Sequence, residues 1–227
     1  MRNTVIDVNG EQVDAYLARP AAGSGPAAIV IQEWWGLVPH IRQVVDRLAG
    51  EGFVALAVDH YRGVETTEPD EAQKLMMAVD LPRVAADLAG AAAWLRAQDF
   101  VSDAGIGVVG FCMGGGLALL APTASPEICC AGAFYPAMPW AEYAPDWSAY
   151  AGKAALIHKA ESDESSAGPA IASYAEQIAA HGGTVQIEDY PGSVHAFFND
   201  ARPEVYQEAN ALAAWSTTVE FLHVHCH

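Results

Sequence analysis

One cysteine in this chain stands in a glycine-rich segment of the kind that exposes a nucleophile. The segment GFCMG, residues 110–114, fits the pattern G-x-nucleophile-x-G, with Cys112 in the place often taken by serine. Small neighbours allow a sharp strand-to-helix turn that holds the nucleophile in a strained conformation. The N–H groups that begin the following helix favour a thiolate and an oxyanion. The pattern predicts a cysteine nucleophile; an ordinary buried cysteine in a tight turn is the alternative.

An acid and a histidine follow in the chain order of a hydrolase triad. Asp163 lies just beyond the predicted strand AALIHK, and His195 lies beyond the predicted strand TVQIEDY. The order nucleophile, acid, histidine is that of α/β-hydrolases. His195 would then take the proton of the Cys112 thiol, and Asp163 would fix the histidine tautomer. Glu161 and Glu164 are neighbouring alternatives for the acid.

A further carboxylate, Glu33, directly follows the apolar segment AAIVIQ. A carboxylate at the end of a buried strand costs free energy unless it is paired or used in chemistry. Glu33 is therefore a candidate site residue. The alternative is a helix-capping acid that points to water.

The elements predicted to position these side chains are apolar strands that alternate with helices. Helical periodicity separates several of the strands, as over residues 81–98, and the predicted strands are AAIVIQ, FVALAVD, IGVVGF, CCAGAFY, AALIHK and TVQIEDY. This alternation indicates an α/β fold, with a mostly parallel sheet and helices on both faces. Ligands bind such sheets at the carboxyl ends of the strands.

The N-terminal part is predicted to be a β-hairpin, because TVIDV and VDAYLA flank the turn signal Asn9-Gly10. The chain shows no linker or internal repeat, so residues 1–227 are expected to form a single α/β domain.

Composition narrows the classes of partner. The formal net charge of −17 argues against nucleic acid and anionic membrane surfaces. No apolar run reaches about 18 residues, and the first ten residues have no secretory h-region, so a cytoplasmic location is expected. With four cysteines and no CxxC pair, neither a disulfide framework nor a metal site is expected. Cys129 and Cys130 are expected to be ordinary buried thiols, and the C-terminal HVHCH a frayed tail.

These motifs together resemble the dienelactone hydrolase family, the carboxymethylenebutenolidase type within the α/β-hydrolase superfamily. The likeness runs over nearly the whole chain, through IVIQEWWG, VDHYRG, VGFCMGGG, IHKAESD and YPGSVHAFF. It implies the α/β-hydrolase fold and hydrolysis of an activated lactone or enol ester through an acyl-enzyme, with no metal or organic cofactor. The expected partner is a small-molecule ester or lactone, and the expected assembly is a monomer or homodimer.

The resemblance also implies roles for particular residues. Cys112, Asp163 and His195 would form the triad. Glu33 would be the family's additional acid, which contacts the resting thiol and helps to form the thiolate when substrate binds. The oxyanion hole would be made by two backbone N–H groups, those of Trp34 and Met113.

Substrate recognition is where the chain departs from the family pattern. Members that take dienelactone bind its carboxylate with two arginines. Arg62 loosely matches the first, but Asn199 stands at the second position, four residues beyond the histidine, and Arg202 is three residues further on. Carboxylate recognition, and with it dienelactone, is therefore an open expectation. The substrate-binding residues expected here are Arg62, Trp35, Tyr135 and Asn199, with Trp34 and Trp35 giving a bulky or aromatic pocket.

Two other classes of function remain open at this stage. The glutamine amidotransferase or DJ-1-like group also places a cysteine on a glycine-rich elbow, but that class wants its histidine and acid close together in sequence. Here Asp163 and His195 lie beyond different strands. A non-catalytic hydrolase-fold protein that binds a small molecule is the second alternative.

Overall fold

Eight strands form one sheet in the computed structural model, which describes residues 2–140, 143–163 and 168–226. The order across the sheet is β1-β2-β4-β3-β5-β6-β7-β8, and neighbours from β4 to β8 run parallel. β1 pairs antiparallel with β2, and β2 antiparallel with β4. The strands are β1 (Thr4–Val8), β2 (Glu11–Ala18), β3 (Ala27–Ile31), β4 (Val54–Val58), β5 (Ile106–Phe111), β6 (Ile128–Phe134), β7 (Ala154–Ser162) and β8 (Thr184–Val194).

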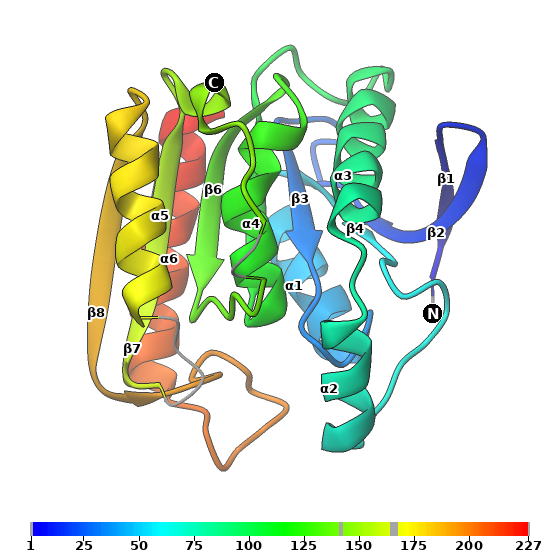
Figure 1. Ribbon diagram of the computed structural model, residues 1–227. Coiled ribbons are helices and arrows are strands. Elements are labelled where there is room, and N and C mark those ends of the chain that lie inside the picture. The colour runs from blue at the N-terminus through cyan, green and yellow to red at the C-terminus, as the bar shows by residue number, and fades with distance from the viewer. Residues whose placement is uncertain (1, 141–142, 164–167, 227) are drawn as a thin grey trace.

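Helices cover both faces of this sheet. In Figure 1, α3, α4 and α5 lie in front of the strands, and α1 and α6 lie behind them. The helices are α1 (Pro39–Gly50), α2 (Pro69–Met77), α3 (Leu81–Arg96), α4 (Met113–Ala124), α5 (Gly168–Ala180) and α6 (Glu208–His225), with a 3-10 turn at Trp147–Tyr150. The predicted α/β-hydrolase architecture is confirmed. The short helix α2, which the sequence analysis did not identify, lies beyond the carboxyl ends of the strands (Figure 1).

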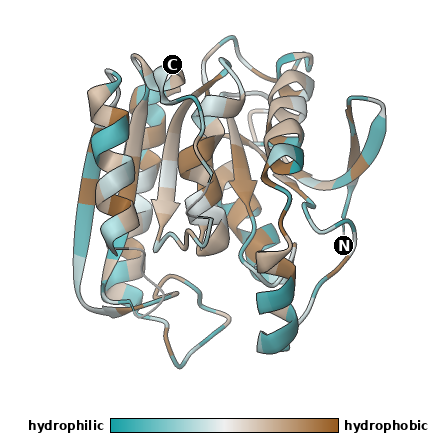
Figure 2. Cartoon of the chain, viewed as in Figure 1, coloured by the Kyte–Doolittle hydropathy of each residue, from teal (hydrophilic) through white to brown (hydrophobic). Residues whose placement is uncertain are grey.

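The central strands are apolar because both of their faces are covered. Every residue of β3, β4 and β5 is buried, and Figure 2 shows β3 mainly in the hydrophobic colours. The N-terminal hairpin has the predicted turn, since Asn9 and Gly10 have φ values of 53° and 89°, as a type I′ turn requires.

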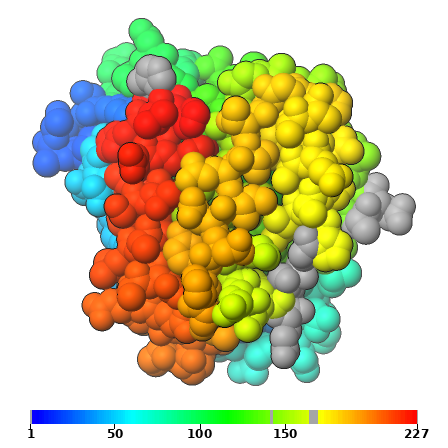
Figure 3. Space-filling view, turned by 90° about the vertical axis from the view of Figure 1, so that its left-hand side faces the viewer, coloured from blue at the N-terminus to red at the C-terminus, as the bar shows by residue number. Residues whose placement is uncertain are grey.

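The outer edge of the sheet is polar. β8 lies beside α6 on the face shown in Figure 3, and most of its residues are exposed or half-buried. Glu188 and Asp189 belong to this strand. Charged side chains on an edge strand oppose pairing with another chain. None of the helices in the described ranges has the length and apolar composition needed to cross a bilayer.

The C-terminal segment is ordered into the fold, so the expectation of a frayed tail is wrong up to residue 226. Helix α6 continues to His225, and Cys226 is buried. The arrowheads of β3 and β6 point down in Figure 1, whereas the C-terminus lies at the top. The end of α6 is therefore at the opposite end of the sheet from the carboxyl ends of the strands.

Candidate active site

Cys112 occupies the strained turn that the glycine-rich pattern predicts. It joins β5 to α4 with φ 55° and ψ −118°, a conformation that L-residues rarely adopt. A Cβ on Gly110 would lie 1.9 Å from the carbonyl oxygen of Gly114, so only glycine fits there. The strain is held by backbone hydrogen bonds, because the Cys112 N–H donates to Phe134 and its carbonyl accepts from Ala137, at 3.0 and 2.9 Å.

His195 and Asp163 form a hydrogen-bonded pair beyond the ends of β8 and β7. The His195 Nδ1 lies 2.8 Å from Asp163 Oδ2 and 3.0 Å from Oδ1. Because Nδ1–H donates to this carboxylate, the other ring nitrogen is the one available to Cys112. Burial lowers the pKa of His195, but its hydrogen bonds to Asp163 and Cys112 raise the pKa by more than burial lowers it. The resulting pKa is about 10.

Asp163 is the acid that meets the histidine. The alternative Glu161 uses its carboxylate elsewhere, accepting a 2.7 Å hydrogen bond from the Gly192 N–H. The other alternative, Glu164, lies outside the described residues.

Glu33 is buried rather than pointed at water, with 1% of its surface exposed. Its Oε2 accepts a 2.8 Å hydrogen bond from Asn199 Nδ2, and its Oε1 a 3.4 Å hydrogen bond from the Tyr135 hydroxyl. Burial, followed by the charge of Glu33, raises the pKa of Tyr135. The helix-capping alternative therefore does not describe this carboxylate.

The candidate residues meet at a small cavity of about 100 Å³. Its lining is mainly aromatic and apolar, with one basic group, and consists of Glu33, Trp34, Trp35, Met76, Cys112, Ala137, His195, Ala196 and Arg202. A larger cavity of about 480 Å³ shares Trp35 and Arg202 with it. The two tryptophan rings touch edge to face at 4.8 Å. The site thus has a narrow reactive end and a wider adjoining groove.

Arg62 does not reach this cavity, which corrects the expectation that it binds the substrate. Its Nη1 and Nη2 donate to the two oxygens of buried Asp87 at 2.8 and 2.7 Å, and its Nε donates to Glu11 at 3.0 Å. Asp87 also accepts from His60. With both edges of its guanidinium engaged, Arg62 joins the hairpin to α3.

Asn199 and Tyr135 both hydrogen-bond to Glu33. Neither lines the cavity of about 100 Å³, but Asn199 lines the wider cavity, whereas Tyr135 is buried and lines neither of the two. Tyr135 additionally packs edge to face against His195, with ring centroids 5.0 Å apart. Both side chains are therefore placed to hold the Glu33 carboxylate, and the expected contact of Asn199 with a substrate stays a prediction.

Arg202 is the basic group that the sequence analysis did not place in the site. Its guanidinium donates to Glu204 at 2.9 Å and lies 6.0 Å from the centre of the Trp35 ring. The signal was present in the sequence, because few basic residues stand near the site motifs of this acidic chain. The loop after β8 brings Arg202 to the cavity, and the course of that loop is not evident from the sequence.

The two backbone N–H groups expected in the oxyanion hole belong to Trp34, which lines the cavity with Cys112, and to Met113, which follows Cys112 in the chain. In the part of the chain that the structure describes, neither Trp34 nor Met113 donates its backbone N–H to another protein group. Met113 begins α4, where N–H groups have no partner within the helix.

Potential metal ligands gather away from this cavity. Among the described residues, the one group of three or more consists of Cys129, Cys130 and Cys226.

Known proteins resemble this chain in sequence and in structure. The family model described as "Dienelactone hydrolase family" matches residues 13–226. "Protein usf" of Aquifex pyrophilus is 33% identical over 222 residues, 95% of each chain. A Bradyrhizobium protein described as "Probable 2-oxo-3-(5-oxofuran-2-ylidene)propanoate lactonase" is 30% identical, over 97% of this chain and 92% of its own. The crystal structure of a "Putative Dienelactone Hydrolase" from Klebsiella pneumoniae superposes with a TM-score of 0.83 at 28% identity, covering 96% of this chain and 95% of its own.

Proposed function

The chain belongs to the dienelactone hydrolase family, and we propose that it hydrolyses small lactones or activated esters through an acyl-enzyme on Cys112. The observation that carries the proposal is the Asp163–His195 pair, joined to Cys112 at the mouth of one cavity. A nucleophile on an elbow, a histidine and a buried acid are the parts of a hydrolase triad.

Acylation begins with attack of the Cys112 sulfur on the carbonyl carbon of the substrate. A thiolate is the nucleophilic form of cysteine, and His195, whose pKa is raised by its hydrogen bonds to Asp163 and Cys112, is the group that takes the thiol proton. As the ring C–O bond of the lactone breaks, His195 gives its proton to the departing oxygen. The product of this step is a thioester on Cys112.

Deacylation uses the same groups in reverse. Neutral His195 takes a proton from water, and the resulting hydroxide attacks the thioester carbonyl. The C–S bond breaks, the carboxylic acid leaves, and the thiolate–imidazolium pair is restored. In both steps the negative oxygen would accept from the N–H groups of Trp34 and Met113, and the start of α4 adds its dipole.

Glu33 supplies a second proton acceptor at the nucleophile. Its carboxylate lines the same cavity as Cys112 and is held by Asn199 and Tyr135. In this proposal Glu33 receives the thiol proton in those molecules where Cys112 rests as a thiol, as the family resemblance implies. A fixed acceptor needs no reorganisation at the moment of reaction.

Arg202 indicates that the acyl group carries a carboxylate. It is the basic side chain that lines both cavities, and among the described residues its ion-pair partner is Glu204, an exposed acid. Exposed ion pairs are weak, so a substrate carboxylate can compete for the guanidinium. The description of the Bradyrhizobium relative, a lactonase for a propanoate, agrees with this choice.

The acyl-enzyme provides the direct test. Rapid quenching during turnover of an enol lactone, followed by peptide mapping, should find the acyl mass on Cys112. The Cys112→Ala variant should carry no acyl group and no activity. Hydrolysis of glutamine without hydrolysis of esters would instead support the amidotransferase class. Tight binding of the lactone without turnover by the wild type would support a non-catalytic binding protein.

A further inference from the structure

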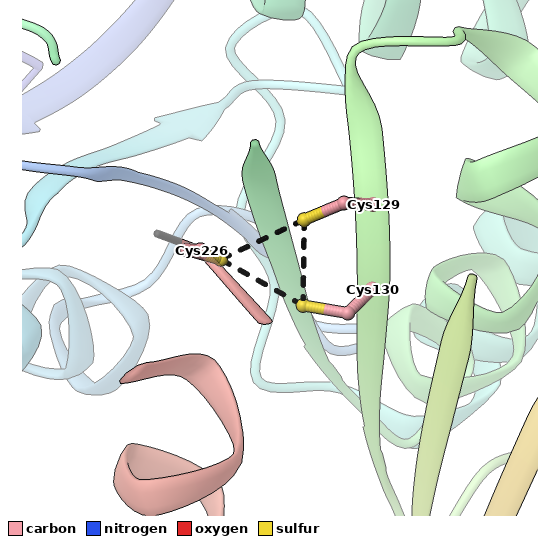
Figure 4. A group of neighbouring side chains, drawn as sticks. All are labelled: Cys129, Cys130 and Cys226. Carbon is pink, nitrogen blue, oxygen red and sulfur yellow. Dashed lines mark hydrogen bonds between the residues drawn. The ribbon is translucent and has the colours of Figure 1, made fainter. Parts of the chain in front are cut away.

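Three cysteine sulfurs meet at the end of the sheet opposite the catalytic cavity. Cys129 and Cys130 lie near the start of β6, and Cys226 follows the last turn of α6 (Figure 4). The sulfur–sulfur distances are 3.9 Å for Cys129–Cys130, 3.8 Å for Cys129–Cys226 and 3.7 Å for Cys130–Cys226. The three sulfurs therefore form a nearly equilateral triangle that joins a strand to the final helix.

A β-bulge brings two consecutive cysteines to the same side. Neighbouring residues of a regular strand point to opposite faces. Here the pairing of β5 with β6 shifts between Ile106 and Gly107: Ile106 pairs with Ile128, whereas Gly107 pairs with Cys130. Cys129 is the extra residue, and a bulge of this kind redirects a side chain. Both sulfurs consequently turn toward Cys226.

Two glycines of the neighbouring segment leave room for the sulfurs. A Cβ on Gly105 would lie 2.5 Å from the Cys129 sulfur, and one on Gly107 would lie 3.0 Å from the Cys226 sulfur. Both distances are too short for ordinary side-chain packing. The space that holds the triangle thus depends on the absence of side chains at these two positions.

The surroundings of the triangle combine burial with electronegative carbonyls. Cys130 and Cys226 are 0% and 4% exposed, while Cys129 is half-buried and gives access from solvent. The Cys129 sulfur lies 3.4 Å from the Ile106 carbonyl oxygen and 3.3 Å from that of His225, at the end of α6. Carbonyl oxygens and a helix C-terminus favour positive charge.

We propose that Cys129, Cys130 and Cys226 bind one thiophilic closed-shell cation, Zn²⁺ or Cu⁺, through three thiolates. The centre of the sulfur triangle lies about 2.2 Å from each sulfur, as its sides of 3.7–3.9 Å require. The Zn–S bond length is about 2.3 Å, so an ion slightly out of the sulfur plane would fit without rearrangement. Soft thiolate ligands select Cu⁺ and Zn²⁺ over harder cations. Binding forms three metal–sulfur bonds and releases the S–H protons to solvent.

The proposal is independent of the hydrolase function, because none of the three cysteines lines the catalytic cavity. It also revises the expectation that Cys129 and Cys130 are ordinary thiols. A disulfide is the competing outcome for such a cluster. It would join two sulfurs at about 2.05 Å and leave the third unused.

The experiment measures metal binding to reduced, metal-free protein under argon. Titration with Co²⁺, as a spectroscopic substitute for Zn²⁺, should give thiolate-to-cobalt charge-transfer absorption that saturates at one equivalent and is displaced by Zn²⁺. A parallel titration with Cu⁺, against a chromophoric Cu⁺ chelator, distinguishes the two ions. At metal concentrations about 100 times Kd, the midpoint of thermal unfolding should rise by about 5–10 °C.

Matched serine variants locate the site. Cys112→Ser removes the catalytic thiol and should bind one equivalent like the wild type, whereas Cys226→Ser should lose the charge-transfer band and bind at least 100-fold more weakly. Gly105→Ala keeps all four thiols but crowds Cys129, and should also weaken binding. Normal circular dichroism and retained esterase activity in Cys226→Ser would show that this variant is folded.

Three results would overturn the proposal. The first is less than 0.2 equivalents of either ion bound by the reduced wild type. The second is binding that Cys112→Ser abolishes and Cys226→Ser preserves. The third is protein isolated from reducing cytosol with a Cys130–Cys226 or Cys129–Cys226 disulfide, identified by peptide mapping, that reforms in preference to metal uptake.

Discussion

The Asn199 amide nitrogen donates to the Glu33 carboxylate at 2.8 Å, and both side chains are buried. Asn199 is therefore a residue that orients an acid, at the position where the family pattern has a substrate-binding arginine. An arginine there would place its charge against Glu33. The amide instead holds the carboxylate without bringing a positive charge to it.

We predict that Glu33→Gln lowers kcat by about 10²-fold, because it removes the proton acceptor while keeping the shape of the side chain. The midpoint of thermal unfolding should change little, since a glutamine oxygen can still accept from Asn199. Steady-state kinetics and calorimetry measure both quantities. Activity within a few-fold of wild type would contradict the role of Glu33.

The coupling of Asn199 to Glu33 gives a second prediction. Asn199→Ala should lower kcat by a larger factor than it raises KM, because the amide holds the carboxylate and lines the wider cavity rather than the one that receives the reacting group. In the Glu33→Gln background the same substitution should have little further effect on kcat. Additive losses in this double-mutant cycle would mean that Asn199 acts through something other than Glu33.

Arg202 and Arg62 form a natural pair of test and control. Arg202→Gln should raise KM for a carboxylate-bearing lactone about 10-fold or more, as loss of one charge-assisted contact implies, and change little for a neutral ester. Arg62→Gln should instead lower stability, because it leaves Asp87 buried without its strongest partner, and should affect both substrates alike. Equal effects of Arg202→Gln on the two substrates would argue against carboxylate recognition.

The histidine of the proposed triad should affect the pH dependence of stability. Its folded pKa of about 10 lies above the ordinary value of about 6.5, so its contribution to stability is complete below pH 6.5 and is lost as the pH rises toward 10. Asp163→Asn should lower that pKa and lower kcat by about 10²–10⁴-fold. NMR titration of the His195 ring measures the first effect. An unchanged ring titration in Asp163→Asn would show that the carboxylate does not set the charge of the histidine.

The sequence predicted the elbow and the hydrolase fold because those features are local or periodic. The glycines around Cys112 encode the turn by steric exclusion, and apolar strands between helices encode the sheet. The hairpin followed from two turn residues. Each of these inferences needs only neighbours in the chain.

Other features depended on contacts between distant segments. Arg62 matched a family position, but its engagement by Asp87 and Glu11 requires the packing of α3 against the hairpin. Arg202 reaches the cavity through the course of a loop that has no periodic pattern. The cysteine triangle depends on one shifted pair of residues between β5 and β6, which regular strand alternation does not reveal.

A buried histidine that does not line the catalytic cavity predicts how the fold responds to acid. Burial lowers the pKa of His158 to about 3. Its Nδ1 lies 2.8 Å from the Tyr190 hydroxyl and its Nε2 lies 2.7 Å from the Thr218 hydroxyl, which itself donates to Ala214. The Thr218 oxygen therefore accepts from Nε2–H, and the Tyr190 hydroxyl donates to Nδ1, which fixes a neutral ring.

The folded pKa of His158 lies below the unfolded value of about 6.5, so between pH 6.5 and 3 the unfolded chain binds one more proton than the folded chain. The free energy of unfolding therefore decreases as the pH is lowered through this range. His158→Gln should be less stable at pH 7, yet its further loss between pH 7 and 5 should be about 2 kcal/mol smaller than that of the wild type. Urea unfolding at the two pH values measures the difference. Parallel losses in both proteins would rule out His158 as the acid-sensitive group.

The two sulfur sites stand at opposite ends of the same strand pair, and this separation governs how the nucleophile responds to oxidants. The Cys112 N–H bonds to Phe134 at one end of β6, whereas Cys130 lies four residues earlier, about 13 Å away along a strand that rises about 3.3 Å per residue. A disulfide needs sulfurs about 2 Å apart. All four cysteines of the chain lie in the described residues, so a sulfenic acid formed on Cys112 has no resolving cysteine within reach. Its repair depends on an external thiol, and under sustained peroxide the Cys112 sulfur proceeds to the irreversible sulfinic acid.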